Sequence, residues 1–488
     1  MDADAVMLSD LATAAADHHP RLVGPDVAVA DLHHDSRSVA TGDGFVAIPG
    51  ASVDGHDFVD GAIACGAAAV VVEHEMAVDV PQLVVSDTRR ALPMLAATVH
   101  GLPSKELTVV GITGTNGKTT VAHMVEAIAT AARRKAGVVG TVGGRIGGEP
   151  IPLSRTTPEA TDLQRLLRRM VDAGVDVVAL EVSSHALVLG RADAVDFDVV
   201  AFTNLSQDHL DFHGSMEHYA AAKLRLFDPA RARRAVVWID DPVGADIAAL
   251  TALDVTSVGR HANADVRGRV LGLTGSGSVI EVTSAWGSAR IELPLAGGFN
   301  ADNALVAVAC ALEIGIGLTE ISEGLGRLGV VPGRFERVDR GQDFTVVVDY
   351  AHTPDAVAAM VTSAGELTRG KVIVVVGAGG DRDAAKRPAM GAAAATADVA
   401  VITSDNPRSE DPAAIIDAVV GGVPGDRAVR VEPDRAKAIA VAIAQARAGD
   451  IVLILGKGHE QGQEAAGVVV PFDDRLAAAA ALEQEVTA

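Results

Sequence analysis

The residues best suited to chemistry lie in one glycine-rich stretch, GITGTNGKTT, from Gly111 to Thr120. It follows an apolar run typical of a buried strand and opens VAHMVEAIATAARR, a stretch typical of an amphipathic helix. Glycines let a loop wind so tightly that its N–H groups and the helix N-terminus face an anion. Lys118 would add positive charge for phosphates, and Thr119 would hold Mg²⁺. Because the spacing misses the strict phosphate-loop pattern by one residue, a turn without ligand remains the alternative.

The nucleotide bound by such a loop is expected to be ATP. The tetrapeptides NKxD and TKxD, with which GTPases read guanine, are absent from the sequence.

Further candidates lie where other apolar strands end. Glu181 opens EVSSHALVLGR, where a carboxylate can hold a second Mg²⁺ or simply cap a neighbouring helix. Lys223, on helical periodicity alone, is an ordinary surface lysine. Between them, TNLSQDHLDFHG carries imidazoles and carboxylates at short spacing, which suit either a metal-hydrolase site or a solvated polar loop. These residues are Asp208, His209, Asp211 and His213.

The last third of the chain places charged residues after strands or at a boundary. PGRFE contains Arg334, DYAHTPD contains Asp349, and GAGGDRDAAKRP contains Arg387. DNPR, Asp405 to Arg408, and GKGHE, Gly456 to Glu460, follow apolar strands. Taken singly, each motif is more often a turn than a site, although basic groups beside glycine-rich backbone suit phosphates or carboxylates.

The elements that must position these residues divide into three domains. Apolar runs alternating with helical stretches predict an α/β class, with a mostly parallel sheet in a central phosphate-loop domain and a Rossmann-like C-terminal domain. The segment 254–294 is turn-rich and predicts antiparallel hairpins joined to the central sheet. Breakers at Gly101–Pro103 and Pro332–Gly333 divide the chain into a small α/β N-terminal domain, 1–103, a central domain, 104–331, and a C-terminal domain, 332–488.

Composition limits the partners and the compartment. A net charge of −23 argues against binding to nucleic acid or anionic membrane. No apolar run is long enough to span a bilayer, and the N-terminus lacks the pattern of a signal peptide, so a cytoplasmic protein is expected. Cys65 and Cys310 are far apart in alanine-rich stretches, where reduced, buried thiols are expected.

Taken in order, these motifs resemble the Mur ligase family, which adds amino acids to the peptide of peptidoglycan precursors. The resemblance runs from about Asp35 to the end of the chain. It is carried by GTNGKTT, EVSSHALVLGR, TNLSQDHLDFH, GGFNADNALVA, PGRFE, DYAHTPD, GAGGDRD, DNPR and GKGHE. Within the family, DNPR is associated with members that add meso-diaminopimelate as the third residue, and Arg408 offers a planar fork for its distal carboxylate.

The resemblance implies site residues in four groups. ATP would be held by Gly114, Thr115, Asn116, Gly117, Lys118, Thr119, Thr120, Asn300, Asn303, Arg334 and Asp349. Mg²⁺ would be held by Thr119, Glu181, His209 and Lys223, the last as an N-carboxylated lysine. The UDP-sugar peptide would contact Ser36, Ala51, Ser52, Val53, Thr156, Thr157, Ser183 and Arg191. Diaminopimelate would contact Arg387, Asp405, Asn406, Pro407, Arg408, Gly456 and Glu460. Lys118, Glu181, His209 and Lys223 would be catalytic.

The implied reaction is ATP-dependent ligation of diaminopimelate to the D-glutamyl carboxylate of UDP-N-acetylmuramoyl-L-Ala-D-Glu, through an acyl phosphate and by a monomer. Leu189 and Arg155 stand where relatives often carry Gln and Asn, which puts two contacts to the UDP-sugar peptide in question. Addition of L-lysine or another diamino acid is one alternative. A folylpolyglutamate synthetase-like ligase is another, although those enzymes lack the uridine-nucleotide domain, and a non-ligase ATPase or metal hydrolase is a third.

Overall fold

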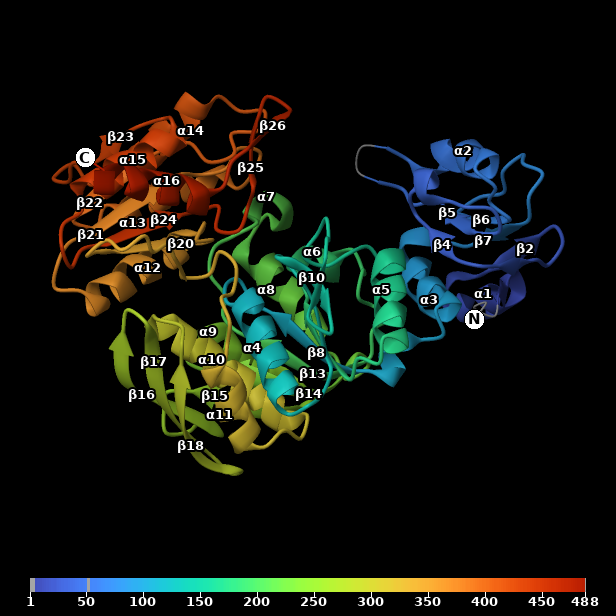
Figure 1. Ribbon diagram of the computed structural model, residues 1–488. Coiled ribbons are helices and arrows are strands. Elements are labelled where there is room, and N and C mark those ends of the chain that lie inside the picture. The colour runs from blue at the N-terminus through green and yellow to red at the C-terminus, as the bar shows by residue number, and fades with distance from the viewer. Residues whose placement is uncertain (1–4, 51–52, 488) are drawn as a thin grey trace.

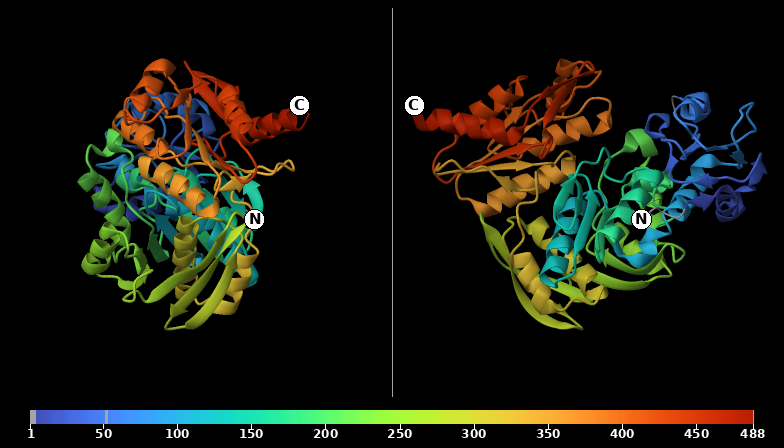
Figure 2. Two further views of the ribbon diagram at one scale, coloured as in Figure 1. Left: turned by 90° about the vertical axis from the view of Figure 1, so that its left-hand side faces the viewer. Right: turned by 45° about the vertical axis from the view of Figure 1, so that its right-hand side comes forward.

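The computed structural model describes residues 5–50 and 53–487, which form three α/β units (Figure 1). The units are built on sheets of five, eleven and six strands in chain order. The N-terminal and C-terminal units lie on opposite sides of the central one, in Figure 1 and in the right-hand view of Figure 2. The α/β class and the three-part architecture expected from the sequence are confirmed. The boundaries at residues 103 and 331 stay predictions.

The N-terminal sheet has the order β2-β7-β6-β5-β4, parallel except for β2. Strand side chains alternate between two cores: Val70 and Val72 pack with α2, and Val71 packs with α1 and α3. The strands are β1 (Val6–Met7), β2 (Arg21–Val23), β3 (Ala28–Val29), β4 (Leu32–His33), β5 (Gly44–Val46), β6 (Ala69–Val72) and β7 (Gln82–Val84). The helices are α1 (Leu8–Ala14), α2 (Val59–Ala64) and α3 (Thr88–Val99).

The central sheet has a parallel core extended by antiparallel strands at both edges. The parallel strands are β9 (Ala136–Gly140), β12 (Val177–Glu181), β8 (Thr108–Thr113), β13 (Phe197–Phe202), β14 (Ala232–Trp238), β15 (Asp254–Gly259) and β16 (Val266–Thr274). At one edge are β10 (Gly143–Ile146) and β11 (Glu149–Ile151), and at the other β17 (Gly277–Ser284) and β18 (Gly287–Leu293). The predicted hairpins over 254–294 are therefore confirmed for β16 to β18.

Helices cover both faces of the parallel core, which is why its strands are nearly all apolar. Val110 of β8 packs with α4 and α10, while the adjacent Val109 packs with α5 on the other face. The helices are α4 (Lys118–Ala131), α5 (Ala160–Asp172), α6 (Ser184–Val188), α7 (Leu210–His213), α8 (Met216–Leu224), α9 (Pro242–Leu250), α10 (Gly298–Glu313) and α11 (Leu318–Gly326).

The C-terminal sheet has the order β19-β20-β24-β21-β22-β23, parallel except for β19. The strands are β19 (Glu336–Arg337), β20 (Thr345–Asp349), β21 (Val372–Val376), β22 (Val399–Ile402), β23 (Arg430–Val431) and β24 (Ile451–Leu455), with a hairpin of β25 (Gly462–Ala465) and β26 (Val468–Pro471). The helices are α12 (Pro354–Leu367), α13 (Arg387–Ala394), α14 (Pro412–Val420), α15 (Arg435–Gln445) and α16 (Asp474–Thr487).

The buried-thiol expectation holds for one cysteine and is wrong for the other. Cys310 is buried in α10, whereas Cys65 is exposed. Its alanine-rich stretch is the short helix α2, which buries Val59 and Ala62 and ends at Ala64. Cys65 caps that end, where the chain turns through the positive φ of Gly66.

Over the described residues, no helix combines the length and the apolar character needed to cross a membrane.

Gly324 of α11 tests how tightly the helices of the central unit must pack. A Cβ there would lie 2.5 Å from Ile128 Cα and 2.8 Å from Ala127 O, both backbone atoms of α4. Because backbone cannot move aside cheaply, Gly324→Ala is expected to lower the free energy of unfolding by about 1–3 kcal/mol in urea denaturation.

A matched control is Gly365→Ala in α12, where a Cβ would meet no described atom within 4 Å. Alanine is the better helix former, so this variant is expected to be unchanged or about 0.5–1 kcal/mol more stable. Equal losses in both variants would contradict the close approach of α11 to α4.

Candidate active site

The glycine-rich loop joins β8 to α4 in a conformation that only glycine fits. Gly114 and Gly117 have φ values of 144° and 88°. A Cβ at Gly114 would lie 1.9 Å from Thr203 Oγ1, and one at Gly117 would lie 2.2 Å from Asn303 Oδ1. The loop is therefore pressed against β13 and α10, and the strand–loop–helix context predicted for Lys118 is present.

Two lysines, the partly buried Lys118 and the buried Lys223, converge on one carbonyl of this loop. The ammonium groups of Lys118 and Lys223 donate to Gly114 O at 2.9 Å and 2.7 Å. Burial lowers the pKa of both side chains, and for Lys223, where the Lys118 charge adds to burial, the pKa is well below its usual value. Lys223 is 1% exposed and lies over the Tyr219 ring, so the surface lysine that periodicity predicted is wrong. Tertiary packing of α8 against the loop overrides the local pattern.

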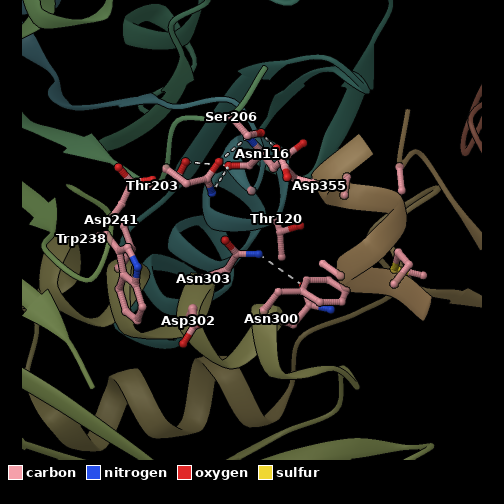
Figure 3. Close-up of a pocket in the computed structure, with 18 of the residues that line it drawn as sticks. Asn116, Thr120, Thr203, Ser206, Trp238, Asp241, Asn300, Asp302, Asn303 and Asp355 are labelled. Carbon is pink, nitrogen blue, oxygen red and sulfur yellow. Dashed lines mark hydrogen bonds between the residues drawn. The ribbon is translucent and has the colours of Figure 1, made fainter. Parts of the chain in front are cut away.

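A cavity of about 330 Å³ opens beside the loop (Figure 3). It is lined by predicted nucleotide residues: Asn116, Gly117, Thr120, Asn300, Asn303, Arg334 and Asp349. It is also lined by residues that the sequence reasoning missed: Thr203, Asn204, Trp238, Asp241 and Asp302. Of these, Thr203 and Asn204 could have been found, because they open the TNLSQDH motif at the end of β13.

Arg334 and Asp349 connect this cavity to the C-terminal unit. The Arg334 guanidinium stacks 4.7 Å from the Tyr350 ring centre and donates to Thr119 Oγ1 at 3.0 Å. Asp349 accepts from the N–H groups of Phe335 and Ala351, both at 2.7 Å. Burial raises the pKa of the Asp349 carboxyl, which the nearby Arg334 opposes. Asp349 thus organises the linker, and its expected contact with a ribose stays a prediction.

Glu181 ends β12, and His209 caps the N-terminus of α7 beyond the end of β13, with β8 between the two strands. The Glu181 carboxylate accepts from Thr141 N at 2.9 Å and Thr141 Oγ1 at 3.0 Å. Burial lowers the pKa of His209 to about 3, so its imidazole is neutral and able to ligate a metal. A carboxylate, a neutral imidazole and the Thr119 hydroxyl form a donor set compatible with a divalent cation.

The metal-hydrolase alternative is not supported by the placement of its residues. Asp208 pairs with Lys386 at 2.9 Å, and His213 Nε2 contacts Ser184 Oγ at 2.9 Å. Within residues 5–50 and 53–487, no three or more His, Cys, Asp or Glu side chains are grouped to hold a metal ion. Asp208 and His213 are therefore engaged in separate contacts, while His209 Nε2 lies 3.3 Å from the Asp208 carboxylate.

A second cavity, of about 260 Å³, lies between the central and C-terminal units. It is lined on one side by Asp208 and His209, and on the other by predicted amino-acid-binding residues. Those residues are Asp405, Asn406, Arg408, Gly456 and Glu460. Arg387 does not line it, because its fork is paired with Glu410 at 2.7 and 2.9 Å.

Two buried cations that the sequence reasoning missed lie behind the residues that line this cavity. Lys457 is fully buried and donates to Asn406 Oδ1 at 2.9 Å and Glu460 Oε2 at 3.0 Å. Arg435, 1% exposed, pairs with Asp474 at 2.6 Å and lies 3.9 Å from Asp405. Lys457 thereby fixes the Asn406 amide, whose nitrogen donates to Glu460 at 2.7 Å.

The residues expected to contact the UDP-sugar peptide fall at the junction of the N-terminal and central units. Thr157 Oγ1 donates to Ser183 Oγ at 3.3 Å, and Thr156 and Thr141 hydroxyls are 3.0 Å apart. Ser36 opens a 3₁₀ turn beside a cavity of about 280 Å³, lined by its neighbours Asp35 and Arg37. Val53 is exposed, while Ala51 and Ser52 lie outside the described residues.

Arg191 is held by a carboxylate. Glu159 pairs with Arg89, Arg155 and Arg191 at 2.8, 2.7 and 2.9 Å. Arg155, one of the two departures from the family pattern, therefore has a structural partner. Leu189, the other, caps the C-terminus of α6.

Comparison with known proteins agrees with this geometry. The chain matches the Mur ligase middle domain over residues 112–311, the Mur ligase glutamate ligase domain over 333–458, and the Mur ligase family catalytic domain over 29–108. The chain belongs to the Mur ligase family. It is therefore a ligase, as the ordered motifs predicted.

Named relatives align with nearly the whole chain. A Streptomyces coelicolor protein named UDP-N-acetylmuramoyl-L-alanyl-D-glutamate--2,6-diaminopimelate ligase is 47% identical, covering 96% of this chain and 94% of its own. A Geobacillus kaustophilus protein of the same name is 46% identical, covering 94% and 96%.

Solved structures extend the similarity to the fold. One titled with the same name has a TM-score of 0.69 at 31% identity, covering 99% of both chains. A MurF ligase from Thermotoga maritima in complex with ADP has a TM-score of 0.66 at 19% identity, covering 94% of this chain and 98% of its own, and supports the fold alone.

The ion pair between Asp208 and Lys386 is expected to hold the central and C-terminal units together. Both side chains are buried, and removing one partner of such a pair costs about 3–5 kcal/mol. Asp208→Asn should therefore favour more open arrangements, detected as a larger radius of gyration in X-ray scattering. Asp211→Asn is the control, because Asp211 has no ion pair among the described residues, and an unchanged radius in Asp208→Asn would contradict the role.

The same pair gives an expected pH dependence. Burial opposes ionisation of Asp208, but His352, Lys386 and His209 hold its pKa well below the usual value. A carboxyl with a lowered pKa contributes stability that is complete above its unfolded pKa, about 4, and is lost as the pH falls through the folded value. The compact arrangement should persist at pH 5 and open in stronger acid.

Proposed function

We propose that this ligase joins meso-diaminopimelate to the D-glutamyl carboxylate of UDP-N-acetylmuramoyl-L-Ala-D-Glu, with conversion of ATP to ADP and phosphate. The observation that carries the choice of amino acid is the cavity between the central and C-terminal units. Arg408 lies there with the carboxylates of Asp405 and Glu460. A planar cation and two acids suit an amino acid whose distal end carries both a carboxylate and an ammonium group. The relatives that share this name cover nearly the whole chain.

The nucleotide is proposed to occupy the cavity beside Trp238 and Asn303, with its phosphates on the glycine loop. Lys118 donates to loop carbonyls in this structure, and its ammonium would turn to the phosphates. Arg334, one of whose nitrogens donates to Thr119, supplies a second cation there. Together they would stabilise charge on the transferring phosphoryl oxygens.

Mg²⁺ is proposed to be held by Thr119, Glu181 and His209, with Lys223 as an N-carboxylated ligand. When bound, it would supply positive charge to the phosphate oxygens. The lowered pKa of Lys223 favours its uncharged amine, the form that reacts with carbon dioxide. Carboxylation would replace a side chain that repels Lys118 when protonated by an anion that attracts it.

The reaction then has two steps. The D-glutamyl carboxylate attacks the γ-phosphorus in line and ADP leaves, which gives an acyl phosphate. The amine of diaminopimelate attacks the acyl carbon, phosphate leaves, and the amine loses a proton. Because the two cavities lie on either side of the Arg334 linker, closure of the C-terminal unit would bring the amine to the intermediate and exclude water.

Two rivals remain within ligase chemistry. Addition of L-lysine would leave Arg408 without a carboxylate, which the cavity chemistry disfavours. A folate-type ligase has structural support, since a folylpolyglutamate synthase from Mycobacterium tuberculosis has a TM-score of 0.62, but at 22% identity and over 81% of this chain. A cytoplasmic, monomeric enzyme is part of the proposal.

The deciding experiment is phosphate release from ATP with UDP-N-acetylmuramoyl-L-Ala-D-Glu and a panel of amino acids. We expect release with meso-diaminopimelate and at most slow release with L-lysine. Faster phosphate release with L-lysine would mean that lysine, and not diaminopimelate, is the amino acid that is added. Release with ATP alone would point to an ATPase and overturn the ligase proposal.

Lys223→Ala tests the N-carboxylated lysine. The variant is expected to lose activity by about a hundredfold or more, because a metal ligand is missing, and to regain part of it with added short carboxylates such as formate or acetate. Lys437→Ala, at an exposed lysine, is the control and should behave as the unchanged protein. Full activity of Lys223→Ala without added carboxylate would contradict the role.

Arg408→Lys tests recognition of the distal carboxylate. A point charge cannot replace a bidentate fork, so the KM for diaminopimelate should rise by about tenfold or more, as for loss of one charged hydrogen bond. The KM for ATP should change little. Arg427→Lys, at an exposed arginine of the same unit, is the matched control. Equal changes for both substrates would argue against a direct contact.

A further inference from the structure

The largest of the cavities described here has no part in the proposed reaction. It measures about 590 Å³, lies along α4, and is lined by five basic side chains from three places in the fold. Arg133, Arg134 and Lys135 follow α4, Arg145 is on β10, and Arg327 follows α11. The only acidic residue in its lining is Glu126, which leaves four net positive charges on a chain of net charge −23.

Most of this positive charge has no acidic partner. Arg134 and Lys135 donate to the carbonyls of Ile314 and Ala173, at 3.2 and 2.7 Å. Both carbonyls belong to the residues that end α10 and α5, and a carbonyl does not neutralise a full charge. Arg133 has no side-chain hydrogen bond or ion pair within the part of the chain that the structure describes. The dipole of α4 accounts for one cation at its C-terminus, but not for charges arriving from β10 and α11.

The partly paired arginines keep free donors. Arg145 contacts Glu126 through Nε at 2.9 Å, and its side chain is 41% exposed. Arg327 pairs with Glu323 at 2.7 Å, and its side chain is 76% exposed. The pair of Arg327 with Glu323 lies at the surface and is worth little, so an incoming anion can replace it at low cost, whereas the mostly buried Glu126 keeps Arg145 in place.

One rim of the cavity is bare backbone. Gly147 and Gly148 form the turn between β10 and β11 with φ values of 57° and 94°. A Cβ at Gly147 would lie 2.4 Å from Lys135 Cε, so the turn packs directly on that side chain. The turn therefore covers one side of Lys135 and adds backbone, without acidic side chains, to the rim of the cavity.

The opposite wall belongs to the linker that leads to the nucleotide cavity. Leu328 to Val331 line the basic cavity, and three residues later Arg334 donates to Thr119. α11, which precedes this wall, contacts α4 backbone at Gly324. Figure 1 shows α4 and α11 together in the lower part of the central unit. A ligand shared by Arg133 and Arg327 would connect α4 to the linker.

We propose that this cavity binds a phosphate-bearing small molecule and thereby restrains the linker against α4. A guanidinium group can bind two phosphate oxygens at once, and four arginines line one concave space. Concavity favours a small ligand over the broad face of an acidic protein.

Binding is tested by calorimetry with tripolyphosphate in the absence of Mg²⁺, at fixed ionic strength and on the full chain. The unchanged protein should show two sites, one at the glycine loop and one at the basic cavity. Lys118→Ala should keep the second site. Arg133→Gln/Arg327→Gln should weaken the second site by about tenfold or more, the effect of losing at least one charge-assisted hydrogen bond, and Lys437→Gln should leave it unchanged.

Two outcomes would overturn the site. One is equal binding by the unchanged protein and Arg133→Gln/Arg327→Gln. The other is binding of an acidic peptide, such as polyglutamate, at this surface when tripolyphosphate does not bind.

Hydrogen exchange tests the effect on the linker. In Lys118→Ala, tripolyphosphate should slow exchange of the amides of residues 327–331, and it should not do so once Arg133→Gln/Arg327→Gln is added. Unchanged exchange despite binding would refute the restraint. Neither measurement requires turnover, so failure of the ligase proposal and failure of this one are distinguishable.

Discussion

The carbonyl oxygen of Gly114 is the point on which the active site depends. Two ammonium groups, from the partly buried Lys118 and the buried Lys223, donate to it at 2.9 and 2.7 Å without an acidic partner in hydrogen-bonding distance. Burial lowers the pKa of both lysines, and the charge of Lys118 lowers that of Lys223 further. An anion that entered the site would relieve the repulsion between these two cations. Gly114 itself has a φ of 144°, in the region that favours glycine.

Charged side chains also connect the active site to the C-terminal unit, across its junction with the central unit. Arg334 lies in the linker, stacked on Tyr350 and bonded to Thr119, so the nucleotide cavity is incomplete without the third unit. Asp208 in turn holds Lys386 across that junction. The apolar core of the central unit continues into the C-terminal unit, and these buried polar contacts lie beside it. The polar contacts can exchange partners when ligands bind, and they connect the orientation of the C-terminal unit to the charge at the glycine loop.

Buried charges also serve as supports beneath the substrate-facing residues. Lys457 and Arg435 sit under the amino-acid cavity and hold Asn406, Glu460 and Asp405. At the junction with the N-terminal unit, Glu159 forms ion pairs with three arginines and so orients them. In each case a fully or nearly buried ion fixes the orientation of groups in or beside a cavity, as preorganised sites require.

The sequence by itself determined the α/β class, the strand–loop–helix around Lys118, the hairpins of β16 to β18 and the family. Those features follow from local signals: apolar periodicity, glycine spacing and ordered motifs. It could not determine burial of Lys223, exposure of Cys65, the pairing of Arg387 with Glu410, or the supports Lys457 and Arg435. Each of these depends on which segments distant in the chain pack together. The helical pattern around a lysine is the same whether its side chain points into water or, as for Lys223, contacts Gly114. Only the tertiary structure decided that, because burial changes the cost of a charge and so its chemistry.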